Sequence, residues 1–161
     1  MSDIRMYPEG SGSVKSRYIN GIQVIFGQVK SLRTRLTTAQ VNAGADLLGA
    51  LPGVRWRLFD AAMIAIGGAA TTNTSVNITG TRSGSAVQLF IAATARLAQS
   101  VKLVTGTPFA IAGAESLTSL ADGASYTQLD NNTAVRATNV GAAMTVATHI
   151  DFLFSYVADP A

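Results

Sequence analysis

The sequence predicts an all-β fold, a β-sandwich or jelly-roll-like domain with an extended N-terminal arm. Short segments alternate apolar and polar residues, turn-forming Gly, Pro, Asn and Ser recur about every ten residues, and only one short segment carries helix signals. A chain of 161 residues fits one domain. We therefore expect a flexible arm over residues 1–17 and a single β-sandwich domain over residues 18–161.

The expected arm mixes Pro, Gly and Ser with charged residues and shows no hydrophobic period. It has no apolar stretch of the kind found in secretory signals, and it contains acidic as well as basic residues, so we do not expect a targeting peptide. No stretch further along the chain has the length and apolar character of a membrane span, and a membrane partner is not expected.

Regular alternation begins after the arm. Ile22, Val24 and Phe26 share one parity, residues 30–36 alternate in the same way, and Gly27 between the two segments predicts a bulge or bend. A helix of one or two turns is expected next within residues 36–53, capped by Thr37 or Thr38 and stopped at Gly44.

A long central strand is predicted from Val54 to Ile66, entered through the Pro52–Gly53 turn. Trp56 should face the core while Arg55 and Arg57 face outward. Past Asp60 both parities become small or apolar, which indicates cover on both faces by another layer or subunit. Together with the last strand, this segment supplies the residues expected in the core or at a subunit interface, namely Trp56, Phe59, Met63, Ile64, Phe152 and Phe154.

Further strands are predicted at regular spacing up to the C-terminal region, and the last of them has the clearest pattern. In that strand, Ile150, Phe152, Phe154 and Tyr156 share one face and His149, Asp151 and Ser155 the other. A strand of this quality is expected inside a sheet. The remaining strands are predicted over residues 74–80, 85–97, 100–106, 107–113 and 133–140, with a loop over 121–133 and the last strand over 144–159.

Charged residues make up 13% of the chain, against about 25% in a typical soluble domain. The mean hydropathy is also positive, at +0.29. Such an exterior suits a protein whose surface is covered by copies of itself or by a scaffold. The charge is uneven, since eight basic and three acidic residues lie up to Arg57, and four basic and six acidic residues follow.

Few residues are candidates for catalysis or metal binding. The chain has no cysteine, and His149 with Asp151 provides too few ligands for a typical metal site. Ser155 lies too far along the strand from His149 for direct activation. Asp122 and Asp130 could contact calcium, but turn capping explains them better. We therefore predict no catalytic residues, no cofactor, no metal, no small-molecule substrate and no enzymatic activity.

A basic patch is the remaining candidate site, formed by Lys30, Arg33, Arg35, Arg55 and Arg57 with aromatic residues interleaved. Such a patch could line a nucleic-acid groove. The parity of the strand directs the only tryptophan toward the core, however, so nucleic acid is not the expected partner. An acidic protein surface fits the same charges.

The run GADLLGALPGVRWRLFDAAMIAIGGAATTNTSVNITGT, over residues 44–81, resembles capsid decoration or cement proteins of tailed bacteriophages. The Ala-, Thr- and Gly-rich body down to HIDFLFSYV extends this likeness over residues 40–157. The resemblance implies a structural virion protein that is made in the host bacterial cytoplasm and clusters, often as homotrimers, on the outer capsid surface. There it would tie neighbouring capsomers together and stabilise the capsid.

The major capsid protein and further copies of the chain are the partners that this resemblance implies. An arm can add a strand to a partner's sheet edge, and basic residues around it can approach an acidic capsid surface. A tail, neck or fibre protein shares the same composition, and a glycan- or nucleic-acid-binding module around Arg55, Trp56 and Arg57 is a third possibility. The expected capsid contacts are Arg5, Lys15, Arg17, Lys30, Arg33 and Arg35.

Overall fold

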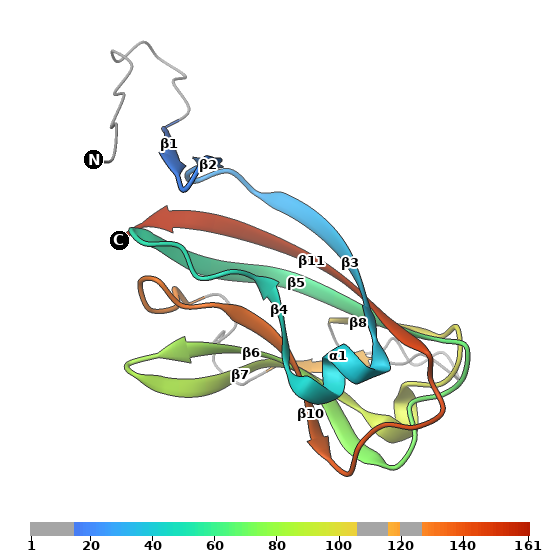
Figure 1. Cartoon of the computed structure of the whole chain (residues 1–161). Helices are drawn as coiled ribbons and strands as arrows, with labels where there is room; N and C mark the ends of the chain where they lie inside the picture. Colours follow the sequence, from blue (N-terminus) through green and yellow to red (C-terminus); the bar gives the residue numbers. More distant parts are fainter. Residues whose placement is uncertain (1–14, 106–115, 120–126) are drawn as a thin grey trace.

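A computed structural model describes residues 15–105, 116–119 and 127–161 and shows a β-sandwich of two four-stranded antiparallel sheets (Figure 1). The predicted all-β sandwich is confirmed. The first sheet contains, in spatial order, β3 (Lys30–Thr37), β11 (His149–Pro160), β5 (Val54–Ile66) and β8 (Lys102–Thr105). The second contains β4 (Ala45–Leu48), β10 (Val135–Gly141), β6 (Asn73–Arg82) and β7 (Ser85–Ala93).

The two sheets are joined along one side by β9 (Ser116–Ser119). This strand runs parallel to β8 of the first sheet and antiparallel to β7 of the second. Its residues were not predicted as a strand. The strand that the sequence predicts over residues 107–113 lies outside the described residues.

The last strand, β11, lies inside the first sheet as predicted, between β3 and β5. In its register, Phe152 lies opposite Thr34 on one side and Met63 on the other. The pairing with β5 shifts between Ser155 and Tyr156, which leaves Phe59 as the extra residue of a β-bulge. The bulge lets both Leu58 and Ala61 face the core although three positions separate them.

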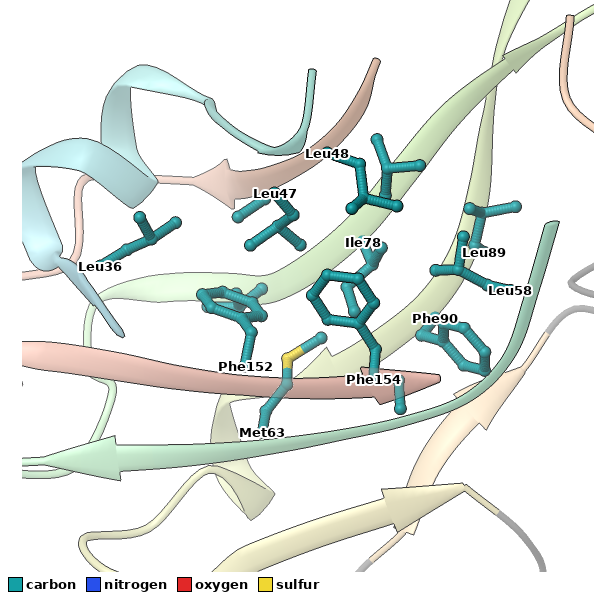
Figure 2. Close-up of a cluster of buried hydrophobic side chains, with 14 of the residues drawn as sticks. Leu36, Leu47, Leu48, Leu58, Met63, Ile78, Leu89, Phe90, Phe152 and Phe154 are labelled. Carbon is teal, nitrogen blue, oxygen red and sulfur yellow. The ribbon is translucent and has the colours of Figure 1, made fainter. Parts of the chain in front are cut away.

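The core fills the space between the sheets with side chains from both (Figure 2). Met63 and Phe152 from the first sheet and Ile78 and Phe90 from the second are almost completely buried. Of the residues predicted for the core or an interface, Trp56, Met63, Phe152 and Phe154 are buried. Phe59 and Ile64 are only partly buried, because they lie on the opposite face of the first sheet.

The predicted short helix is present as α1 (Thr38–Ala43). The Thr37 side chain accepts a hydrogen bond from the Gln40 backbone, and the Gln40 side chain accepts one from the Thr37 backbone, which completes a capping box. Gly44 ends the helix with φ 78°, a left-handed conformation that glycine adopts without strain. The next four residues form β4, which the sequence did not reveal because its buried residues, Leu47 and Leu48, are adjacent and show no alternation.

An N-terminal hairpin precedes the sandwich, with strands β1 (Ser16–Ile19) and β2 (Ile22–Ile25). Asn20 and Gly21 form its two-residue turn, both with positive φ, as a type I′ turn requires. The hairpin lies beside the C-terminal end of β11, where the Gly27 amide donates to the Ala158 carbonyl (Figure 1). Residues 16 and 17 therefore belong to a strand rather than to the expected arm, and residues 1–14 lie outside the described part.

Two predicted strands are shorter than expected. The strand predicted over 85–97 ends at Ala93, and a 3₁₀ turn, η1 (Thr94–Arg96), follows it. The last strand begins at His149 rather than at residue 144. Met144 and Ala147 are nevertheless buried, so the segment before His149 is a loop packed on the core, and its two buried residues are three positions apart instead of alternating.

Close packing between Gly80 and Leu129 gives a test of this arrangement. A methyl group at Gly80 would lie 2.5 Å from Leu129 Cδ1. We expect Gly80→Ala to lower the free energy of unfolding by about 1–3 kcal/mol through overpacking, and Leu129→Ala to lower it by about 2–5 kcal/mol through a cavity. The double variant should lose less than the sum, because each change relieves the other.

Urea unfolding of the four proteins in this cycle measures the coupling. Gly49→Ala is the matched control, because nothing lies within 4 Å of the added methyl group. Strictly additive losses would show that the two residues do not share the same space.

Candidate functional site

The outward surface of the first sheet carries Arg33, Arg35, Asp151, Lys102 and His149. We call this surface the outer face and define it by the side chains that point away from the second sheet. Its register follows from the pairing of β3 with β11, of β11 with β5 and of β5 with β8. Successive cross-strand rows contain Ser31, Ser155 and Asp60, then Arg33, Leu153, Ala62 and Val104, then Arg35, Asp151, Ile64 and Lys102, then Thr37, His149 and Ile66.

A buried carboxylate organises the β3 side of the outer face. Asp151 is 1% exposed, while the side chains of Arg33 and Arg35 are 62% and 50% exposed. Arg35 donates from Nε to Asp151 Oδ1 at 2.6 Å and from Nη2 to Oδ2 at 2.9 Å. Arg33 donates from Nη2 to Oδ2 at 2.5 Å. Two guanidinium groups thus cover one carboxylate, and the cluster carries a net positive charge.

These contacts control the protonation of the carboxylate. The hydrogen bonds from Arg35, and then those and the charge of Arg33, lower the pKa of Asp151 to about 2, although burial acts in the opposite direction. The same hydrogen bond raises the pKa of Arg35. Asp151 therefore stays ionised over the whole physiological pH range.

Next to this cluster, the outer face is apolar. A shallow hollow of about 370 Å³ lies between the β3 and β8 sides of the sheet. Leu153, Ala62 and Val104 give it an apolar floor, and Val104 is 41% exposed. Arg33 and Lys102 stand on opposite sides of this floor, and Ser31 and Ser155 share a 3.0 Å hydrogen bond at one end. Asp60 is the acidic residue of the lining.

The second basic segment, around Trp56, does not form an open aromatic site. Trp56 is 5% exposed, its Nε1 donates to the Gly49 carbonyl at 3.1 Å, and its ring meets Tyr156 edge-on. Arg57 lies over the Phe59 ring and donates to Asp159 Oδ1 at 2.9 Å. The predicted inward direction of Trp56 and outward direction of Arg57 are confirmed, and the tryptophan ring is not accessible for stacking on a ligand.

The predicted capsid-contact residues separate into two groups. Arg33 and Arg35 act together on β3, and Lys30 begins the same strand. Lys15 and Arg17 lie instead at the N-terminal hairpin, where the Arg17 guanidinium packs against the turn at Gly53. Arg5 lies outside the described residues.

Sequence reasoning grouped Asp151 with His149 and missed its arginine partners. Asp151 lies 116 positions from Arg35 along the chain, and only the antiparallel register brings the two together. One available signal was the Arg-x-Arg pattern on one strand with a single carboxylate of matching parity on another. His149 Nδ1 lies 3.0 Å from its neighbour Thr148 Oγ1.

The carboxylates considered for calcium have structural roles where they are described. Asp130 accepts hydrogen bonds from the Gly84 and Ser83 amides at 2.8 and 3.0 Å, and these bonds lower its pKa. It therefore caps the β6–β7 turn as expected, while Asp122 lies outside the described residues. Within residues 15–105, 116–119 and 127–161, no group of three or more His, Asp or Glu side chains is arranged to hold a metal ion.

None of the helices in the described part of the chain is long and apolar enough to cross a membrane. Comparisons of the chain with family models, with curated proteins and with solved structures each found no match.

The Asp151 cluster should make the stability of the fold depend on pH. The pKa of Asp151 is about 2 in the fold against its ordinary 3.8, so its contribution to stability is complete above about pH 5 and is lost as the pH falls toward 2. The amount is on the order of 2 kcal/mol. Asp151→Asn should therefore destabilise the protein at pH 7 by about 2–4 kcal/mol, and its deficit should shrink as the pH falls.

Denaturant unfolding of the two proteins between pH 7 and pH 2 measures this deficit. Asp46→Asn is the control, because it removes a half-exposed carboxylate paired with Arg136 and should cost at most about 1 kcal/mol. A deficit for Asp151→Asn that stays constant with pH would contradict the role assigned to the ionised carboxylate.

Proposed function

We propose that this protein is a structural virion component that decorates the outer surface of an icosahedral phage capsid. In this proposal, homotrimers bind between capsomers and stabilise the shell. The outer face of the first sheet makes the contact with the major capsid protein. The likeness of residues 40–157 to phage decoration proteins supports the class, and the composition of the outer face supports the mode of binding.

The observation that carries the proposal is an apolar floor on the solvent side of a sandwich sheet. A two-layer sandwich needs apolar side chains only between its sheets, and the outward residues normally alternate as polar. Here Leu153, Ala62, Ile64 and Val104 are neighbours on the outer face, with Arg33 and Lys102 beside them. An apolar centre with a charged rim is typical of a surface that another protein covers.

Further exposed apolar side chains lie away from the outer face. Tyr18, Ile22 and Val29 are exposed in and after the N-terminal hairpin, and Val140 and Val146 are exposed near the end of β10 and the loop that follows it. A subunit in a shell needs separate surfaces for its own copies and for the capsid. Many weak contacts of this kind sum to firm attachment through avidity.

A tail, neck or fibre location is compatible with the same surfaces, so location in the particle is the first test. Antibodies against the protein should label the heads of purified phage particles in electron micrographs. Labelling confined to tails would replace the capsid assignment with the tail alternative. A freely dispersed monomer at high concentration, with no affinity for particles, would contradict both.

Arg33 provides a test of the contact surface. We expect Arg33→Gln to reduce occupancy on capsids stripped of the protein by roughly tenfold at low salt, because a positive group facing an acidic surface is lost. Arg35 still holds Asp151 through two hydrogen bonds in this variant. Arg136→Gln is the matched control, because Arg136 is similarly exposed but belongs to the second sheet. Equal occupancy of both variants would show that the outer face does not contact the capsid.

A further inference from the structure

We propose that the free edge of β3 is a docking site for an extended, acidic segment of a partner protein, which adds to the first sheet as a further strand. This inference deepens the proposed function, since it names the mode in which the proposed capsid contact is made. It rests on the backbone geometry of β3 and on the charge of the side chains beside it.

Within the described residues, β3 pairs with β11 on one side and with no strand on the other. The direction of its backbone groups follows from its C-terminal end. The Thr38 amide donates to the Thr148 carbonyl next to β11, whereas the Thr37 amide donates to the Gln40 side chain. Because these directions alternate along an antiparallel strand, the amides and carbonyls of Ser31, Arg33 and Arg35 point away from β11.

This edge is long and regular enough to accept a strand. It spans eight residues without proline, and its register with β11 shows no shift. The edge at the other end of the sheet order, β4, has four residues, and its neighbour β10 shifts register beside it. Natural proteins usually protect edges by shortening them, by bulges or by charges. On β3 the charges of Arg33 and Arg35 protect the edge from unspecific pairing. They disfavour basic partner strands and favour acidic ones.

The charge beside the edge is positive. Arg33 and Arg35 neutralise Asp151 together and leave one positive charge in excess. Lys102 across the outer face adds to it, while Asp60 subtracts. A carboxylate from an added strand would lie directly opposite the arginines at the spacing of cross-strand pairs, where opposite charges stabilise pairing.

The same charges disfavour a second copy of β3 as the occupant. Antiparallel pairing of two β3 strands with their outer faces on the same side brings Arg33 opposite Arg33 or Arg35 of the other copy in the registers that pair most of the strand. Like charges directly opposite one another are destabilising. Nucleic acid also fits less well, because phosphate oxygens accept hydrogen bonds but cannot satisfy the outward carbonyls of the strand.

The test uses the full chain and an eight-residue synthetic peptide in which glutamate alternates with threonine. We expect the labelled peptide to bind, measured by fluorescence anisotropy, with affinity that falls as salt is added. Amide hydrogen exchange should slow at Ser31, Arg33 and Arg35 in the complex. A peptide with lysine in place of glutamate and a single-stranded oligonucleotide should bind at least tenfold more weakly.

Ser31→Pro is the decisive variant, with Ser31→Ala as its matched control. Proline removes the outward amide of Ser31 at an edge position where no backbone hydrogen bond to β11 is lost. Alanine keeps this amide, and both variants lose the hydroxyl and its hydrogen bond to Ser155. Ser31→Pro should weaken peptide binding by roughly tenfold and Ser31→Ala by less than about twofold. Thermal unfolding of both variants verifies that the fold is retained.

Equal affinity of these two variants, slowed exchange elsewhere in the chain, or equal binding of the lysine peptide or the oligonucleotide would overturn the inference. Its failure can be distinguished from failure of the proposed function. If Ser31→Pro occupies stripped capsids as well as the unaltered protein does, strand addition is wrong and decoration stands. If the protein binds the acidic peptide through β3 but no capsid, strand addition stands and decoration is wrong.

Discussion

The pairing of β11 with β3 and β5 is the constraint on which the rest of the structure depends. Its register places Ile150, Phe152 and Phe154 in the core and Asp151 and Leu153 on the outer face. A slip of one residue would exchange these sets, exposing two phenylalanines and placing a carboxylate in the apolar core. The core and the candidate binding surface are therefore two consequences of one alignment.

The outer face explains why the central strand looks buried on both sides in the sequence. In β5, Met63 and Ala65 face the second sheet, while Ala62 and Ile64 face outward. Neither set contains a charged residue, so the alternation that marks a solvent-facing sheet is missing there. Under the proposed function, both faces of β5 are apolar because one is covered by the second sheet and the other by a neighbouring protein in the assembly.

Those parts of the fold that rest on local periodicity were predictable. The alternation of β11, the inward tryptophan of β5 and the capped helix α1 each depend on residues close together in sequence. β4 was not predictable because its buried residues, Leu47 and Leu48, are adjacent and do not alternate. β9 was not predictable because it is defined by the strands it pairs with. The Arg33, Arg35 and Asp151 cluster was missed for a related reason, since its partners meet only after two distant strands align.

The position of β11 also affects the order in which the chain can fold during synthesis. The strand lies between β3 and β5 but follows both of them by more than eighty residues along the chain. Until β11 emerges from the ribosome, β3 has no paired strand among the described strands of its sheet, and the edge of β5 that will pair with β11 is unpaired. Contacts between such distant segments form slowly. Nascent chains halted before His149 would expose unpaired strand edges that can bind chaperones or aggregate with one another.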